Sequence, residues 1–323
     1  MKKSNLDFTS SEGKFLGTFG CDSKKTYFNM MKNLFAALVF PIFILTAQPG
    51  RMDTLRIPGR PANEDRVFVW IPAQGVEKVQ HVLYMNDGQN LFDSSTTWNG
   101  RAWMVRESLD SLISNGYIPP ILLVAIPNSD IRHSEYTPEK PFRSLPAEVQ
   151  QYYRTAVRPN GTSYYRADVV GDSYLQYVTQ RVKPEIERQY LKNKTSIKAY
   201  IAGASMGGLI AWYAVLRYPD AFDGAACFAT HWPLIQEIPS AAGEGFISYF
   251  HQRFHSVKEK RWYFDYGDRG IDTLYGPYQQ VVDRLFKSNH IGNTYKSLFF
   301  PVHDHNEIYW KMRFPAAIRF LVN

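Results

Sequence analysis

The chain alternates short apolar segments with longer ones in which apolar residues recur every three or four positions. Seven short segments have the length and composition of buried strands, and the longer Trp103–Asn115 and Tyr174–Tyr190 have the spacing of amphipathic helices. Strands interleaved with such helices predict the α/β class, with a mostly parallel sheet covered by helices on both faces. The expected strands are Arg66–Ile71, His81–Met85, Ile121–Ile126, Ile197–Ala202, Gly224–Ala229, Arg261–Tyr266 and Tyr295–Phe300.

Two long segments interrupt this alternation. Residues 132–172 are rich in Tyr, Pro and Arg, and they predict either a lid or substrate wall or, equally, a surface insertion whose tyrosines pack locally. Residues 232–260 form the second insertion. Because ligands bind outside the carboxyl ends of parallel strands, we expect His231 and Trp232 to border the cleft and to provide shape and stacking rather than proton transfer.

One motif has the sequence of a nucleophile elbow. The apolar stretch from Tyr200 enters Gly203-Ala204-Ser205-Met206-Gly207, and a helix-like stretch from Leu209 leaves it. This strand, turn and helix setting would expose the Ser205 hydroxyl above the sheet edge, with glycines where strand and helix approach closely. The N-terminus of the outgoing helix would favour developing negative charge. Ser205 is therefore the candidate nucleophile.

A serine nucleophile needs a histidine to take its proton and a carboxylate to orient that histidine. Downstream of Ser205 the chain supplies both, in the order acid and then histidine. The acid is expected on the loop after the strand Arg261–Tyr266, where Asp268 and Asp272 have nearly equal claims from spacing alone. The late histidines are His303 and His305, on a loop between the last expected strand and a helix expected over Glu307–Leu321.

Five motifs follow one another along most of the chain. They are Tyr84–Phe92 with Asp-Gly-Gln, Ile118–Pro120 leading into Leu122–Ile126, Gly203–Gly208, Tyr263–Gly267, and His305–Glu307 with Trp310. In this order, from about Val67 to Leu321, the chain resembles the putative-esterase family of α/β-hydrolases. That family includes enterochelin esterases, feruloyl and acetylxylan esterases of carbohydrate esterase family 1, and mycolyltransferases. The resemblance implies an α/β-hydrolase fold.

The resemblance also assigns roles. The histidine followed by Asn-Glu and a nearby Trp is the base in that family, which favours His305 over His303. The family's acid usually lies several residues beyond the glycine that ends its strand, which favours Asp272. By the same resemblance, the main-chain amides of Gln89 and Met206 would form the oxyanion hole.

Composition and charge agree with an enzyme of this kind. The chain has 323 residues, 45% hydrophobic and 21% charged, which is enough for a large core in one domain. The net charge of +7 falls to +4 without residues 1–50, which carry six lysines and three acidic residues. The remaining basic residues are scattered, so we expect no nucleic-acid partner.

The N-terminal region predicts export. Met31-Lys32-Asn33 followed by the apolar stretch Leu34–Ala47 resembles a bacterial secretory signal peptide, with an uncleaved anchor as the alternative. We expect a leader over residues 1–48 and a single catalytic domain over residues 51–323. Met31 is the expected true start, and residues 1–30 are then either an over-extended gene prediction or a poorly ordered leader. Removal of the leader leaves Cys227 alone, so no intrachain disulfide is expected in the secreted or periplasmic protein.

The function expected from these features is that of a serine esterase that forms an acyl-enzyme. Its substrates would be small-molecule or polysaccharide-linked esters, including feruloyl and siderophore esters. Two alternatives are acyl transfer on the same fold and a non-catalytic binding protein on a hydrolase scaffold. His303-Asp304-His305 has too few neighbouring ligands for a metal site, no phosphate-binding loop motif occurs, and no cofactor is expected.

Overall fold

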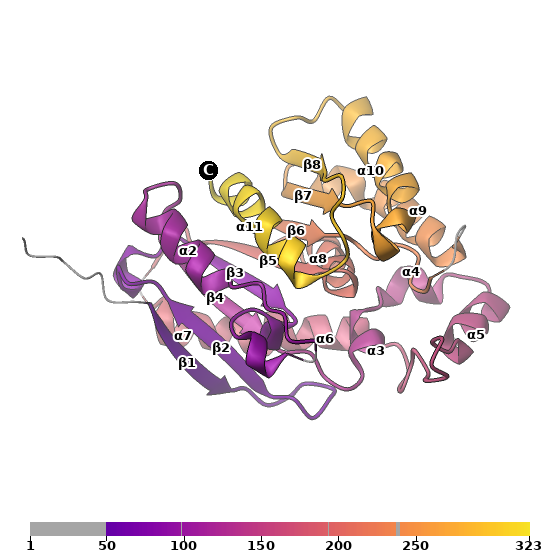
Figure 1. Cartoon of the computed structure of the whole chain (residues 1–323), viewed down its shortest axis with the longest axis horizontal. Coiled ribbons are helices and arrows are strands. Elements are labelled where there is room, and N and C mark those ends of the chain that lie inside the picture. Colours follow the sequence, from indigo (N-terminus) through magenta and orange to yellow (C-terminus); the bar gives the residue numbers. More distant parts are fainter. Residues whose placement is uncertain (1–49, 98, 193, 237–239) are drawn as a thin grey trace, which may run out of the picture. The chain divides into compact units, whose positions relative to one another are not determined.

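An eight-stranded sheet forms the centre of the protein (Figure 1). The computed structural model describes residues 50–323 apart from 98, 193 and 237–239, so the expected leader lies outside the described residues. The strand order is β1-β2-β4-β3-β5-β6-β7-β8. The strands are β1 (Arg51–Arg56), β2 (Arg66–Ile71), β3 (His81–Asn86), β4 (Ile121–Ile126), β5 (Lys198–Ala204), β6 (Gly224–Phe228), β7 (Arg261–Tyr266) and β8 (Tyr295–Phe299).

The sheet is mostly parallel, as the sequence predicts. Strands β3 to β8 pair in parallel, whereas β2 pairs antiparallel with both β1 and β4. All seven expected strands form within two residues of their predicted ends. The eighth, β1, was not predicted. Its Arg51, Asp53 and Arg56 side chains make it a polar edge strand without the apolar run that identifies the others.

Helices cover both faces of the sheet. They are α2 (Val105–Ser114), α3 (Arg132–Tyr136), α4 (Glu139–Arg143), α5 (Ala147–Thr155), α6 (Gly171–Tyr177), α7 (Lys183–Tyr190), α8 (Met206–Arg217), α9 (Ala241–Val257), α10 (Gly276–Ser288) and α11 (Glu307–Val322). The helix expected over Tyr174–Tyr190 is α6 and α7 joined by a π-helical turn, Val178–Val182. Pro184 lies just beyond this turn and lacks the N–H of a continuous α-helix.

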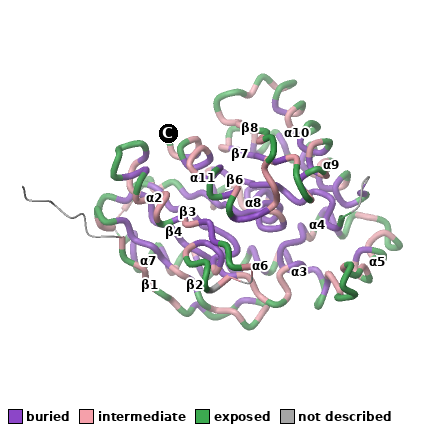
Figure 2. Tube along the Cα trace, in the orientation of Figure 1, coloured by how far each residue is buried: buried purple, intermediate pink, exposed green. Residues whose placement is uncertain are grey.

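Two cores form because successive side chains of a strand point to opposite faces. On β3, Val82 and Tyr84 join the core under α6 to α10, whereas Leu83 and Met85 join the core under α2 and α11. Figure 2 shows the buried residues concentrated along the central strands and α8. No helix within the described ranges is long and apolar enough to cross a membrane. Because β3 and β5 are buried along nearly their whole length, they fix the loops that follow their carboxyl ends.

His81, at the opposite edge of the sheet from those loops, gives a test of the fold. Burial lowers the pKa of His81 to about 4, so the folded protein resists its protonation whereas the unfolded chain does not. The contribution of His81 to stability is present above about pH 6.5 and is lost as pH falls toward 4. Between about pH 7.5 and about pH 5 we expect it to account for about 2 kcal/mol of lost unfolding free energy.

The measurement is urea unfolding at both pH values for the protein and its His81→Gln variant. The variant should lose less unfolding free energy on acidification than the parent. His255→Gln changes an exposed histidine and serves as the control. An equal loss in parent and His81→Gln would contradict a buried neutral His81.

Candidate active site

Ser205 lies in a strained turn between β5 and α8. Its backbone has φ 58° and ψ −124°, a conformation that residues other than glycine rarely adopt. A Cβ on Gly203 would lie 2.5 Å from the Gly207 oxygen, and a Cβ on Gly207 would lie 2.8 Å from Asp87 Oδ2. The approach of Gly203 is to main chain and admits only glycine, whereas Gly207 faces the end of a side chain that Arg132 holds. The expected strand, turn and helix geometry around Ser205 is therefore present.

His305 and Asp272 are in direct hydrogen-bond contact. His305 Nδ1 donates to Asp272 Oδ1 at 2.6 Å, and Asp272 is fully buried. The competing Asp268 instead accepts a hydrogen bond from the Val302 amide at 2.7 Å. His303 accepts one from Arg313 Nε at 3.2 Å. Geometry thus pairs His305 with Asp272, which spacing alone left tied with Asp268.

A buried arginine that sequence reasoning missed holds this pair. Arg313 on α11 has no exposed side-chain surface, and its Nη1 donates to Asp265 at 3.2 Å and to Asp272 Oδ2 at 3.4 Å. The same Asp272 oxygen accepts the Gly267 amide at 2.7 Å. Burial raises the pKa of Asp265, and the Arg313 guanidinium acts against that rise. The sequence could have indicated this role, because Arg313 follows Trp310 by three residues and so lies on the same buried face of α11.

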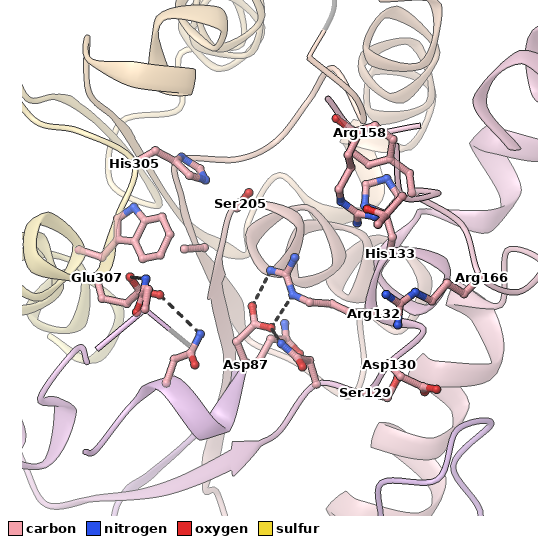
Figure 3. A pocket seen from close by; sticks show the side chains of 18 of the residues that line it. Asp87, Ser129, Asp130, Arg132, His133, Arg158, Arg166, Ser205, His305 and Glu307 are labelled. Atoms are coloured by element: carbon pink, nitrogen blue, oxygen red, sulfur yellow. Dashed lines mark hydrogen bonds and ion pairs between the residues drawn. The ribbon is translucent and has the colours of Figure 1, made fainter. Parts of the chain in front are cut away.

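A cavity of about 690 Å³ opens beside Ser205 (Figure 3). Ser205, His305 and Trp310 line one side of it, and residues 128–133 and 158–166 line another. Two parts of the excursion at residues 132–172 therefore line the cavity, whereas its Tyr153 and Tyr165 are packed in the core. Two of its lining residues each have a buried polar atom, Asn90 Oδ1 and Trp310 Nε1, without a hydrogen-bond partner among the described residues.

The Asp-Gly-Gln loop lies against the serine turn. Gly88–Asn90 forms a short 3₁₀ turn, and neither the Gln89 amide nor the Met206 amide donates a hydrogen bond to another described residue. Arg132 donates to both oxygens of Asp87, at 2.6 and 2.7 Å. This ion pair, which the sequence did not reveal, fixes the loop beside Gly207.

His231 and Trp232 occupy different positions from those expected. Trp232 is fully buried, stacks on Phe264 and contacts Trp212, so it offers no surface to a substrate and belongs to the core. His231 is also buried, and its Nδ1 lies 2.8 Å from the Tyr275 hydroxyl. Burial first, and the nearby His305 second, lower the pKa of His231 to about 3. The neutral His231 ring contacts the Tyr275 hydroxyl, and the His231 main-chain amide donates to the Ser205 carbonyl at 3.2 Å.

Known proteins resemble this chain in sequence and in fold. It is 27% identical over 200 residues to ferri-bacillibactin esterase BesA of Bacillus subtilis strain 168, covering 57% of this chain and 63% of that protein. It is 28% identical over 140 residues to the uncharacterized protein YbbA of the same strain, covering 43% of this chain and 45% of that protein. The chain thus spans less than two thirds of the length of either relative.

A solved structure shows the same fold. An IroE-like serine hydrolase from Shewanella oneidensis superposes with a TM-score of 0.61 at 18% identity, over 84% of this chain and 80% of that one. The fold is therefore that of the α/β serine hydrolases. The model of the Putative esterase family, a family of ester hydrolases, matches residues 60–321. On this match, which spans nearly all of the described chain, the protein belongs to the Putative esterase family.

Proposed function

We propose that this protein is a serine esterase that hydrolyses carboxylic esters through an acyl-enzyme on Ser205. The observation that carries the proposal is the strained Ser205 turn on the same cavity as the His305–Asp272 pair. In the first step His305 takes the Ser205 proton as the oxygen attacks the ester carbonyl, and Asp272 holds the ring in place. His305 then returns the proton to the leaving alcohol. Water, activated by the same histidine, releases the acid.

The tetrahedral intermediate needs donors for its oxyanion. We assign this role to the main-chain amides of Gln89 and Met206, because both lack a partner among the described residues and flank the serine turn. Met206 is also the first residue of α8, where the helix dipole favours negative charge. Removing one donor of this kind typically costs about 100- to 1000-fold in rate.

The substrate is proposed only as a class. BesA is named as an esterase of ferri-bacillibactin, and the sequence resemblance extends to feruloyl and carbohydrate esterases. A cavity of about 690 Å³ is large enough for a drug-sized ester. Its lining contains many polar side chains, among them Asn86, Asn99 and Asn128. We therefore propose a polar, small-molecule or polysaccharide-linked ester, met outside the cell if the leader directs export.

The mechanism predicts that substitutions at Asp272 and His305 abolish activity, whereas substitutions at the competing Asp268 and His303 do not. Hydrolysis of p-nitrophenyl butyrate should fall by about 1000-fold or more in Ser205→Ala, His305→Ala and Asp272→Asn. The neighbour Asp268→Asn removes no proposed catalytic group and should retain kcat within a few-fold. His303→Ala removes only an acceptor of Arg313, so its kcat should fall far less than that of His305→Ala. Circular dichroism checks the fold of each variant. A dead Asp268→Asn beside an active Asp272→Asn would reverse the assignment of the acid.

Arg313 is proposed as a positioning residue for Asp272. Arg313→Lys keeps the positive charge but loses the fork that reaches Asp265 and Asp272 together. We expect kcat to fall about tenfold while KM changes little, because Asp272 and His305 become less well oriented. Arg313→Met leaves two buried carboxylates without their cation and should cost about 3–5 kcal/mol of unfolding free energy.

The control for this prediction lies on the same helix. Arg319→Lys alters an arginine that faces Tyr117 near the end of α11, away from the Asp272 carboxylate. Steady-state kinetics and thermal unfolding of the Arg313 and Arg319 variants separate positioning from stability. Full kcat in a stably folded Arg313→Lys protein would contradict the positioning role.

A further inference from the structure

The cavity has a basic wall that the proposed ester hydrolysis does not use. Arg158 and Arg166 both line it, on the excursion that interrupts the α/β alternation. Figure 3 shows them on the side of the cavity across from His305 and Glu307. Along the sequence the basic residues are scattered, and only the fold brings these two to one cavity. Two guanidinium groups thus face the same cavity as Ser205, where their positive charges have no role in the proposed hydrolysis.

The carboxylates of the cavity do not neutralise this wall. Asp87 is engaged by Arg132, and Glu307 accepts a hydrogen bond from the Asn99 amide at 2.9 Å on the other side. Neither Arg158 nor Arg166 forms an ion pair with a carboxylate in the part of the chain that the structure describes. Asp130 also lines the cavity, but it lies beyond ion-pair distance of both arginines.

The positive charges affect one another. Burial lowers the pKa of Arg158, and the charges of Arg166 and Arg132 lower it further. The same wall contains His133, whose buried ring packs against Tyr164 and Tyr165. Burial, His231, Arg132 and Arg158 keep the pKa of His133 well below its ordinary value, so the ring is neutral. A bound anion would offset this repulsion between cations that share one cavity.

Arg158 is held ready for such a contact. Its guanidinium lies over the Tyr164 ring, 4.6 Å from the centroid, and Nη1 donates to the Ser163 carbonyl. Stacking of this kind orients the planar group and leaves donors at its edge, which match the two oxygens of a carboxylate or phosphate. The fixed side chain loses little further freedom on binding. A lysine at this position would lack both the stacking and the fork.

We propose that Arg158 and Arg166 form an anion subsite, and that the preferred substrates are esters bearing a carboxylate or similar oxyanion remote from the scissile bond. This inference rests on the proposed esterase function and deepens it. The anion would bind across the cavity from Ser205 and hold the ester carbonyl at the serine. The subsite would also raise the rate of encounter with anionic substrates at low ionic strength.

The test compares charged and neutral esters of equal length. On the acyl side, the mono-p-nitrophenyl esters of succinate, adipate and suberate are compared with their methyl-capped forms. On the alcohol side, 4-(butyryloxy)benzoate and 4-(butyryloxy)phenyl phosphate are compared with methyl 4-(butyryloxy)benzoate. In at least one series kcat/KM should be about tenfold or more higher for the anion, because hydrogen bonds between a guanidinium and an oxyanion are charge-assisted.

Variants show whether the wall causes the preference. In the double variant Arg158→Met, Arg166→Met, kcat/KM for the preferred anion should fall about tenfold, and more than for its neutral partner. Arg106→Met, which alters an exposed arginine outside the cavity, should leave the preference unchanged. Raising NaCl from about 20 to about 500 mM should weaken the preference of the parent but not that of the double variant.

The outcomes separate the subsite from the esterase function. If the parent hydrolyses neutral esters but prefers no anion in either series, or if the double variant keeps the preference, the subsite is wrong. If the parent hydrolyses no ester, the proposed esterase function is wrong. The anion subsite is then tested by the binding of a dicarboxylate instead of by kinetics. In that case suberate should raise the thermal midpoint of the parent, but not of the double variant, and dimethyl suberate should raise neither. Equal effects of suberate on both proteins would overturn the subsite.

Discussion

The close approach of β5 and α8 around Ser205 is the constraint on which the site depends. Ser205 has a positive φ of 58°, and the Gly203 and Gly207 main chains meet where no Cβ fits. Backbone strain of this kind costs about 1–3 kcal/mol and persists because the surrounding core determines it. The core here is the buried parallel strands and the fully buried face of α8. The strained turn places Ser205 on the cavity and begins α8 at Met206 directly after it.

A second, buried electrostatic network holds the other half of the site. Arg313 connects α11 to the loops after β7, through Asp265 and Asp272, and it also donates to His303. Fully desolvated charges contribute to stability only when each finds its partners. The described contacts supply them, with the Gly267 amide on Asp272 and the Tyr263 hydroxyl on Asp265. The last helix therefore stabilises the fold and orients the His305–Asp272 pair at once.

Sequence patterns predicted the features that depend on local order. Apolar runs gave seven strands, and the glycine spacing around Ser205 gave the strained turn. Patterns failed where the outcome depends on distant partners. Trp232 looked like a cleft residue because it follows a strand, but Trp212 and Phe264 enclose it in the core. Spacing left Asp268 and Asp272 tied, since only the folded loop shows which carboxylate reaches His305.

The same limit explains the charged groups that the sequence did not assign. The sequence does not distinguish Arg132, Arg158 and Arg313 from the other scattered basic residues. In the fold, Arg132 pairs with Asp87, Arg158 faces the cavity and Arg313 is buried. Their roles follow from the neighbours that the sheet brings together. A basic composition thus says little about function until each cation is matched to its partner.

The central claim is that Ser205 is an activated nucleophile, and covalent labelling tests it most directly. A fluorophosphonate probe is incubated with the folded protein, and the modified residue is located by peptide mass mapping. The account predicts a single adduct on Ser205, which disappears when the protein is unfolded in urea before labelling. No adduct in folded protein, or modification of a different residue, would contradict the account and favour a binding protein on a hydrolase scaffold.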